Sequence, residues 1–187
     1  MNADVRHAHA TDLDRAADTL AAAFEDYPWT RHVLPEDDYL TRLRELQRLY
    51  LGYALEHGIV AVTDNCDGVI ALLTPDAPDP EPEMIEQVVS LHGERIDRLG
   101  HSVPQAHVWR LETLGVRPEA QGGGRATALL DFALTKVAGR GGRDVALDTS
   151  DARNVRLYER HGFTIVSHNE RAGSPPVWSM IRSASAG

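Results

Sequence analysis

A glycine-rich segment in the second half of the chain contains the residues best able to do chemistry. A β-rich run from Leu111 to Val116 leads through Pro118 to three consecutive glycines, 122–124, and then to Arg125. A strand, a glycine-rich turn and a helix N-terminus together bind phosphate, because unpaired N–H groups favour an anion and missing side chains let it approach. The segment therefore predicts a phosphate-binding turn to which Arg125 adds charge. A tight turn that needs positive φ is the simpler alternative.

Two common phosphate motifs do not fit this turn. The pattern GxxxxGK[ST] requires a lysine and then Ser or Thr after its last glycine, and neither follows Gly124. The pattern GxGxxG fails because Gly122, Gly124 and Thr127 occupy the positions of its three glycines. That pattern also belongs after the first strand of a fold, whereas this turn lies in mid-chain.

A second segment, residues 154–163, indicates which phosphate-containing ligand the glycine turn would bind. Residues 121–126 (QGGGRA) fit (Q/R)-x-x-G-x-(G/A), and residues 154–163 fit N-x-x-x-Y-x-x-x-G-F. As a pair separated by one expected strand, they resemble the pyrophosphate loop and the second motif of the GNAT N-acetyltransferase superfamily. Over residues 5–182, the order of the expected strands and helices also resembles that of the superfamily. It implies an enzyme that transfers an acetyl group from acetyl-CoA, as cosubstrate, to a primary amine.

The resemblance also implies how acetyl-CoA is held. The backbone of Leu114, Gly115 and Val116 would bind the pantetheine arm, and the Leu114 N–H would stabilise the charge that the thioester oxygen gains. Asn154 would hydrogen-bond the arm, the alternative being a solvated residue in a first helical turn. The pyrophosphate would lie on the turn, whose residues are Gln121, Gly122, Gly123, Gly124, Arg125, Ala126 and Thr127.

Tyr158 and Glu112 are the expected acid and base. Tyrosine has a pKa of about 10 and a thiol about 8.5, so Tyr158 can protonate the leaving thiolate. Its alternative role is an amphipathic side chain at a helix–sheet seam. Glu112 is expected to share the strand alternation of Leu114 and so to face the acceptor, unless it is a strand residue paired with an arginine. An amine with a pKa of about 8 is already partly neutral, so a weak base or water chain would suffice.

The segment after the first expected helix carries candidate acceptor contacts. Tyr27, Trp29 and His32 suit stacking on a flat ring, and Glu25 and Asp26 could attract a cationic amine. A loop anchored by its own aromatic residues is the alternative.

A closer resemblance bears on the acceptor. Residues 20–32, 111–116, 148–150, 158–160 and 178–180 are similar to the puromycin N-acetyltransferases within the superfamily, which implies a small-molecule amine, such as an aminonucleoside antibiotic, and a resistance role. Trp29 and Glu112 depart from that branch. A protein or peptide amine, or a non-catalytic acyl-CoA sensor, therefore stays open as an alternative.

Hydrophobic periodicity predicts the elements that must position these residues. Leu13, Ala17, Leu20 and Phe24 form one helix face, and the aromatic loop 26–29 is expected to end that helix. A proline-rich connector, 75–82, precedes an inserted helix on whose apolar stripe His92 is expected to be packed. The expected strands cover residues 5–10, 59–63, 69–74, 107–116, 143–147, 163–168 and 177–182, and the other helices start at Pro35 and cover 122–139 and 151–161.

The element order predicts a mixed α/β sheet. Strand–helix–strand units need parallel pairing, while the hairpin at 59–74 needs antiparallel pairing, so a pure doubly wound fold is excluded. We expect one domain over residues 1–187, with an insertion at about 75–105. The family resemblance adds about seven strands with helices on both faces, and a splay between the fourth and fifth strands that admits the pantetheine arm.

Composition excludes several classes of function. The 187 residues carry 28 acidic and 19 basic side chains and a net charge of −9, which argues against a nucleic-acid partner. Cys66 is the single cysteine, so no internal disulfide or thiolate metal cage is possible. No metal is expected, because His7 and His9 lack a third ligand nearby.

Without an apolar span or an apolar leader segment, no membrane partner and a cytoplasmic location are expected. Monomer and homodimer both stay open.

Overall fold

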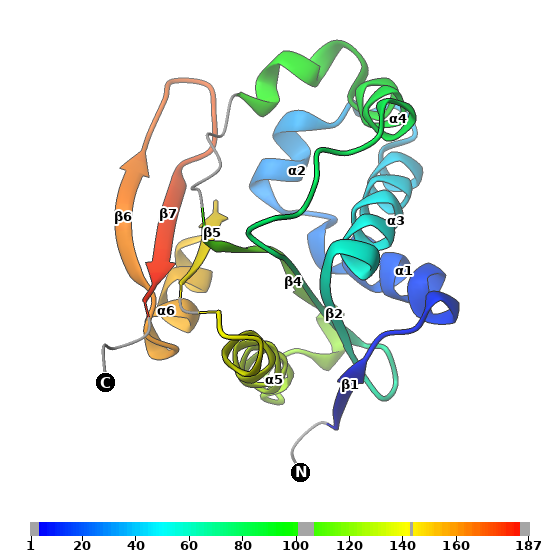
Figure 1. Cartoon of the computed structure of the whole chain (residues 1–187). Coiled ribbons are helices and arrows are strands. Elements are labelled where there is room, and N and C mark those ends of the chain that lie inside the picture. The colour runs from blue at the N-terminus through cyan, green and yellow to red at the C-terminus, as the bar shows by residue number, and fades with distance from the viewer. Residues whose placement is uncertain (1–3, 101–106, 143, 184–187) are drawn as a thin grey trace.

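A sheet of seven strands forms the centre of the computed structural model, which describes residues 4–100, 107–142 and 144–183 (Figure 1). Its order is β1-β2-β3-β4-β5-β7-β6, and only β4 and β5 run parallel. This confirms the predicted mixed sheet. The strands are β1 (Val5–His7), β2 (Gly58–Thr63), β3 (Gly68–Leu73), β4 (Trp109–Val116), β5 (Val145–Thr149), β6 (Thr164–Asn169) and β7 (Val177–Arg182).

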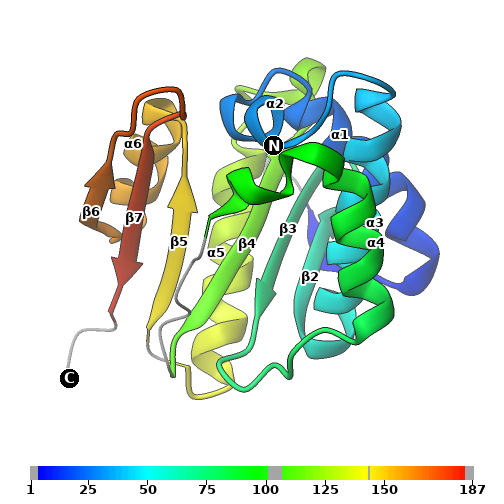
Figure 2. The same cartoon turned by 90° about the horizontal axis from the view of Figure 1, so that it is seen from above.

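Helices cover both faces of this sheet. An apolar core lies between one face and α5 and α6, and a second core lies between the other face and α1 and α3. Figure 2 shows α5 and α6 together behind the strands. The α-helices are α1 (Leu13–Phe24), α2 (Pro28–Val33), α3 (Tyr39–His57), α4 (Pro82–His92), α5 (Arg125–Gly139) and α6 (Ala152–Arg160), and the 3-10 helices are η1 (Ala10–Asp12), η2 (Gly93–Leu99) and η3 (Pro118–Ala120).

The β4 and β5 strands diverge almost as soon as they meet. Their register contains only the pairs Trp109–Val145 and Arg110–Ala146. On its other edge, β4 stays paired with β3 along its length, up to the Val116–Gly68 pair. The second half of the sheet therefore separates from the first at this point, which confirms the splay between the fourth and fifth strands (Figure 2). We call the space between the diverging parts of β4 and β5 the split.

The expected aromatic loop at 26–29 is only partly a loop. Pro28 is the first residue of α2 and Tyr27 is its N-cap. Proline is tolerated at this position because the first N–H groups of a helix have no internal acceptor. The expected helix start at Pro35 is also corrected, because α3 begins at Tyr39 after Asp38, whose φ of +52° is not helical.

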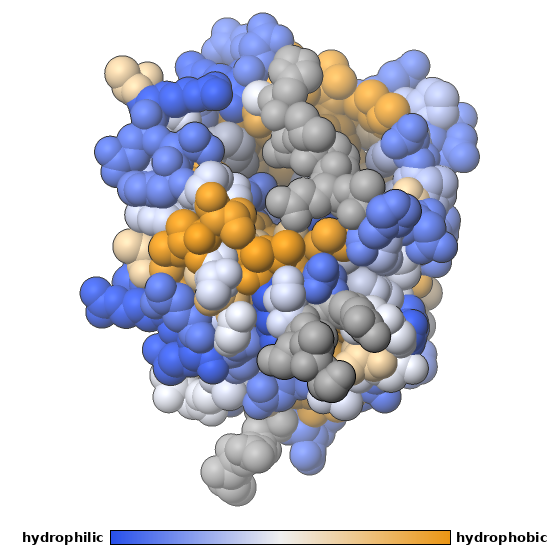
Figure 3. All heavy atoms as spheres, turned by 60° about the vertical axis from the view of Figure 1, so that its left-hand side comes forward, coloured by the Kyte–Doolittle hydropathy of each residue, from blue (hydrophilic) through white to orange (hydrophobic). Residues whose placement is uncertain are grey.

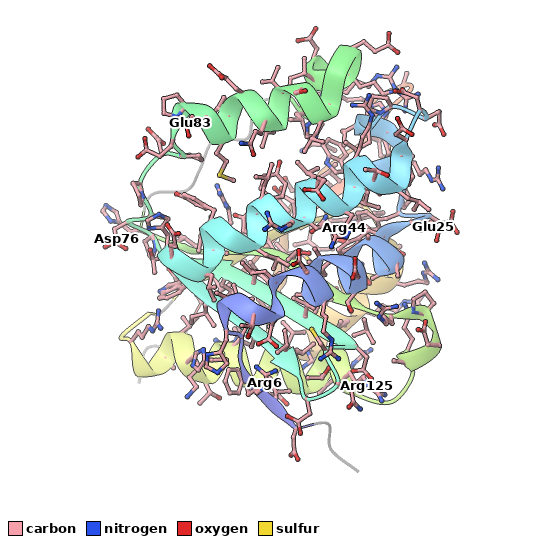
Figure 4. The ribbon with its side chains drawn as sticks, turned by 90° about the vertical axis from the view of Figure 1, so that its right-hand side faces the viewer. Arg6, Glu25, Arg44, Asp76, Glu83 and Arg125 are labelled. Atoms are coloured by element: carbon pink, nitrogen blue, oxygen red, sulfur yellow. The ribbon has the colours of Figure 1, made fainter. Side chains whose placement is uncertain are left out.

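The inserted segment packs on α2 and α3 through arginine side chains. Arg42 of α3 donates to the carbonyls of Ser90 and Leu91, at 3.2 and 3.0 Å. Arg95 of η2 donates to the Arg31 carbonyl over 3.0 Å. Figure 4 shows α4 along α3, with α1 on the other side of α3. The insertion thus continues the helical layer on one face.

His92 is buried as predicted. The side chain has no exposed surface, and its Nδ1 lies 2.8 Å from the carbonyl oxygen of Val88, one turn earlier in α4. Its position on the apolar stripe of the insertion therefore serves packing.

The β6 strand forms the outer edge of the sheet and carries exposed apolar side chains. Ile165 is 45% exposed and Val166 52%. Figure 3 shows apolar side chains gathered on this side of the molecule. The register shifts between Ile165 and Ser167, and such bulges hinder pairing of an edge strand with another chain.

Candidate active site

The glycine turn between β4 and α5 has a left-handed backbone at two positions. Gly122 has φ +79°, and Gly124, the N-cap of α5, has φ +76°. A Cβ atom added at either glycine would meet no atom within 4 Å. These glycines are therefore required by conformation, because L side chains rarely adopt positive φ. The space above the turn is open to a ligand.

The N-terminus of α5 offers unpaired N–H groups to that space. Among the residues that the structure describes, the first N–H of α5 with a backbone acceptor is that of Ala128, which donates to the Gly124 carbonyl over 3.0 Å. The N–H groups of Arg125, Ala126 and Thr127 come before it, and no side chain caps this helix end. The turn therefore has the geometry of an anion site.

Arg125 braces the turn and does not supply the free charge expected of it. Its Nε donates to Asp67 Oδ2 over 3.0 Å, and its Nη1 donates to the Ala120 carbonyl over 3.0 Å. The Asp67 carboxylate, in the turn between β2 and β3, neutralises the guanidinium. Gln121 also folds back, since its Nε2 donates to the Val116 carbonyl over 3.0 Å. Both side chains fix the turn, while its backbone is left to face a ligand.

The diverging part of β4 carries Leu114, Gly115 and Val116. Beyond Arg110, β4 has no strand partner on the β5 side within the described ranges. The backbone of this edge can therefore pair with an extended ligand, as an added strand would. Gly115 has a separate reason to be glycine, because a Cβ there would lie 2.7 Å from Leu20 Cδ2 of α1.

Glu112 lies in a β-bulge, which corrects the expectation that it shares the alternation of Leu114. In the register, Leu111 pairs with Leu72 and Thr113 with Ala71, so Glu112 is the extra residue. Leu111 and Leu114 both pack on the core beneath α5. Glu112 instead contacts Arg110, its neighbour two residues back, through an ion pair. The bulge thus places Glu112 beside Arg110, the last residue of β4 that pairs with β5.

Burial and a second carboxylate raise the pKa of Glu112. Desolvation is the largest cause, the Arg110 charge opposes it, and Asp148 of β5 raises the pKa further. The side chain keeps 29% exposure. A carboxylate with a raised pKa at the opening of a split is suited to general base work. The ion pair with Arg110 also matches the alternative stated above, a strand residue paired with an arginine.

Tyr158 of α6 is buried, with 5% exposure. Its ring meets the Phe163 ring edge-on, with 5.7 Å between centroids. Burial raises its pKa well above the ordinary value, and the nearby Tyr27 adds to the rise. The Tyr158 hydroxyl therefore stays protonated at neutral pH, as a proton donor must.

Tyr27 and Asn154 meet at the end of β5. The Tyr27 hydroxyl lies 3.1 Å from Thr149 Oγ1 and accepts a hydrogen bond from the Ser150 N–H over 2.6 Å. Asn154 Nδ2 donates to the same Thr149 oxygen over 3.5 Å. Two predicted site residues that are far apart in sequence thus share one partner.

The remaining candidate acceptor residues are spread over a wider surface. Trp29 packs on the apolar cluster beneath α2 and α3, and its ring lies 5.8 Å from that of His32. Burial lowers the pKa of His32, and the charges of Arg98 and Arg95 lower it further. Glu25 and Asp26 are exposed, and Figure 4 shows Glu25 at the outer edge of the molecule. The structure therefore anchors Trp29 within its own segment, the alternative stated above.

Comparisons with known proteins agree with this geometry. The sequence profile of the acetyltransferase (GNAT) family matches residues 17–163. The chain belongs to the GNAT acetyltransferase family.

Individual relatives support the GNAT fold. The chain is similar to a mycothiol acetyltransferase of Beutenbergia cavernae, at 41% identity over 75 residues, which cover 39% of the chain and 25% of the relative. The chain thus spans about a quarter of that relative's length. It is also similar to the structure of a "histone acetyltransferase HPA2 and related acetyltransferase" from Corynebacterium glutamicum (TM-score 0.76, 23% identity, covering 100% and 99% of the two chains). A third similarity is to the PaiA N-acetyltransferase of Thermoplasma acidophilum in complex with coenzyme A (TM-score 0.62, 16% identity, covering 98% and 99%).

The GNAT family uses acetyl-CoA, and the residues of this chain fit that cosubstrate. Gly122 and Gly124 leave open space at a helix N-terminus that suits a diphosphate, and the unpaired edge of β4 suits an extended arm. Within the described ranges, no group of three or more His, Cys, Asp or Glu is arranged to bind a metal ion. None of the helices described is long and apolar enough to cross a bilayer.

Three residues near Glu112 were missed by sequence reasoning. Burial raises the pKa of Tyr50 on α3 to about 12, and the Glu112 charge contributes. Arg110 pairs with Glu112, and Asp148 of β5 acts on its pKa. Tyr50 falls on an ordinary apolar helix stripe, so its spacing contains no signal for a site. The GNAT fold brings these side chains together from a helix and from two strands.

Proposed function

We propose that this GNAT enzyme acetylates a primary amine of a small molecule, with an aminonucleoside of the puromycin type as the first candidate. The observation that carries the proposal is the divergence of β4 and β5 directly after Arg110. It leaves Glu112 on one side of the split and the Tyr158-bearing helix beyond the other. The start of α2 lies at this opening, since its N-cap Tyr27 bonds to the end of β5, and this favours an acceptor small enough to enter.

Each residue has a definite task in this proposal. Acetyl-CoA supplies an activated acetyl thioester. The Leu114 N–H donates to the oxygen that gains charge during attack. Glu112, directly or through water, takes the proton of the attacking amine, and Tyr158 gives a proton to the departing sulfur. The buried hydroxyl of Tyr158 suits this task because it does not ionise at neutral pH.

The side chains around Glu112 favour a cationic amine with an apolar or aromatic body. Asp148 and Glu112 place negative charge at the opening of the split, and Arg110 balances only part of it. Tyr50 adds an aromatic surface beside them. The mycothiol acetyltransferase relative also favours a small-molecule acceptor. We further propose a cytoplasmic enzyme that acts as a monomer or homodimer, with resistance to an antibiotic as its role.

Coenzyme A release across an amine panel tests the proposal. The panel contains puromycin, aminoacyl amides, alkyl diamines, and peptides with free α-amines or lysines, and Tyr158→Phe is the control. Product masses identify the acetylated atom. We expect turnover on small α-amines and little on peptides. Activity confined to peptides would replace the proposal with a protein acetyltransferase. Tight acetyl-CoA binding without turnover on any amine would instead indicate a sensor.

A further inference from the structure

We infer that Tyr27 is a positioning residue for acetyl transfer: its hydroxyl holds the end of β5 and the start of α6 across the split. Tyr27 is the N-cap of α2 and belongs to the first half of the chain. Its two hydrogen-bond partners, Thr149 and Ser150, lie 122 and 123 residues away. The inference rests on the proposed role of Tyr158, which α6 carries.

The split is the place where such a link is needed. The β4–β5 register ends at the Arg110–Ala146 pair, so Thr149 and Ser150 have no partner on β4. Within the described ranges, the Tyr27 hydroxyl makes the only side-chain hydrogen bonds that join residues 4–120 to the end of β5. A single phenol thus makes these side-chain hydrogen bonds across the split.

The Tyr27 ring is itself fixed to the β4 side of the split. It meets the Phe24 ring edge-on, with 5.2 Å between centroids. Phe24 Cε2 in turn lies 3.5 Å from where a Cβ of Gly115 would be. Neighbouring residues therefore lead from Gly115 on β4, past Phe24 and Tyr27, to Ser150 beyond β5.

The direction of the hydrogen bonds leads on to Asn154. The Ser150 N–H can only donate, so the Tyr27 oxygen is its acceptor and the Tyr27 proton is free for Thr149 Oγ1. That oxygen also accepts from Asn154 Nδ2 at 3.5 Å and from the Asp151 N–H at 3.4 Å. Asp151 caps α6 by accepting from the Arg153 N–H over 2.8 Å. The network thus fixes the first turn of the helix that carries Tyr158.

Tyr27→Phe tests this inference, with Tyr39→Phe as the matched control. Both changes remove one buried phenol oxygen near α2. The Tyr39 hydroxyl donates to Thr30 Oγ1 over 3.0 Å and to the Phe24 carbonyl over 3.3 Å, and it makes no bond to β5. We expect Tyr27→Phe to lower kcat about 10-fold to 100-fold, the effect of a small misplacement of reacting groups. Tyr39→Phe should change kcat less than about 2-fold, even if both variants lose stability.

A double-mutant cycle with Tyr158→Phe separates positioning from general loss of stability. If Tyr27 acts through Tyr158, adding Tyr27→Phe to Tyr158→Phe should lower kcat by less than about 2-fold more. A full multiplication of the two losses would overturn the inference, as would an unchanged kcat in Tyr27→Phe. Thr149→Val should reproduce part of the loss, and Thr149→Ser, which keeps the hydroxyl, should restore it.

Hydrogen exchange tests the link without reference to the acceptor. Amides of residues 148–154 should exchange faster in Tyr27→Phe than in the wild type, and not in Tyr39→Phe. Unchanged exchange there would overturn the inference even if turnover fell. If Tyr158→Phe left kcat unchanged, the proton-donor role of Tyr158 would fail, while the exchange result would still decide whether Tyr27 holds β5.

Discussion

Replacing Tyr158 by phenylalanine should separate catalysis from folding, because of how the hydroxyl is placed. The ring is buried and packs edge-on against Phe163, and phenylalanine keeps that contact. Within the part of the chain that the structure describes, burial and the nearby Tyr27 account for the raised pKa of Tyr158, and no hydrogen bond of its hydroxyl contributes. Its removal therefore breaks no folded-state bond, and the free energy of unfolding should change by less than about 1 kcal/mol.

The expected loss of turnover is much larger. A positioned proton donor contributes typically about 10²-fold or more to the rate. Loss of this factor raises the barrier by about 3 kcal/mol. The affinity for acetyl-CoA should stay within about 3-fold, because the substitution leaves unchanged the glycine turn and the β4 backbone, which we propose to bind it.

The assay measures coenzyme A release, acetyl-CoA binding by calorimetry and thermal unfolding on the same preparations. The pH profile adds a second check. Burial raises the pKa of Tyr158, so the wild type should show no loss of kcat from this group up to a pH of about 10. An unchanged kcat in Tyr158→Phe would refute the reasoning. So would an alkaline limb below pH 10 that the substitution abolishes.

Three further predictions follow from Glu112, Gly115 and Asp12. Glu112→Gln should lower kcat/KM about 10-fold to 100-fold. The wild type should lose kcat/KM at low pH with an apparent pKa above the ordinary value of about 4.3 for glutamate, since only the ionised form is a base, and the substitution should remove this loss. A low-pH loss that persists in the variant contradicts this role. Gly115→Ala should destabilise the fold by about 1–3 kcal/mol in urea unfolding, because its Cβ would press on α1. Gly52→Ala, where no atom lies within 4 Å, is the control and should not destabilise, so equal losses would contradict the packing argument. The hydrogen bonds from Arg6 lower the pKa of Asp12 far below its ordinary value, so their stabilisation is fully present above about pH 4 and falls steadily as the pH is lowered. Asp12→Asn should cost about 1–3 kcal/mol at pH 7 and clearly less at pH 2, and an equal cost at both would contradict the charge-based account.

Local patterns predicted the parts of the fold that depend on local physics. The hairpin of β2 and β3, the α6 helix and its ending at Gly162 (φ +84°) lie where periodicity and turn residues put them. The prediction of a loop at 26–29 was partly wrong for an equally local reason. Proline both ends a helix before it and starts a helix after it, and the aromatic neighbours of Pro28 do not decide between these outcomes.

The bulge at Glu112 shows what hydropathy alternation cannot predict. A strand without a bulge would place residues 112 and 114 on one face, and that is how the pattern from Leu111 to Val116 reads. The extra residue of the bulge places residues 112 and 114 on different faces, and nothing in the residue types indicates where the bulge occurs. The error matters because it moves Glu112 next to Arg110 and Asp148, whose charges then set its pKa in opposite directions.

The remaining differences between the predicted and the observed site arise from partners that are far apart in sequence. Arg125 was expected to serve a phosphate, yet its guanidinium is bound by Asp67, 58 positions earlier. Tyr27 was expected to stack on an acceptor, which stays a prediction, and its hydroxyl has a further partner at the end of β5. In both cases the residue type was recognised and its partner was not, because only the folded chain brings the partner near. In the mechanism that we propose, chemistry therefore depends on the split in the sheet, since backbone groups free of strand partners would bind a cosubstrate only if other side chains held the separated strands in place.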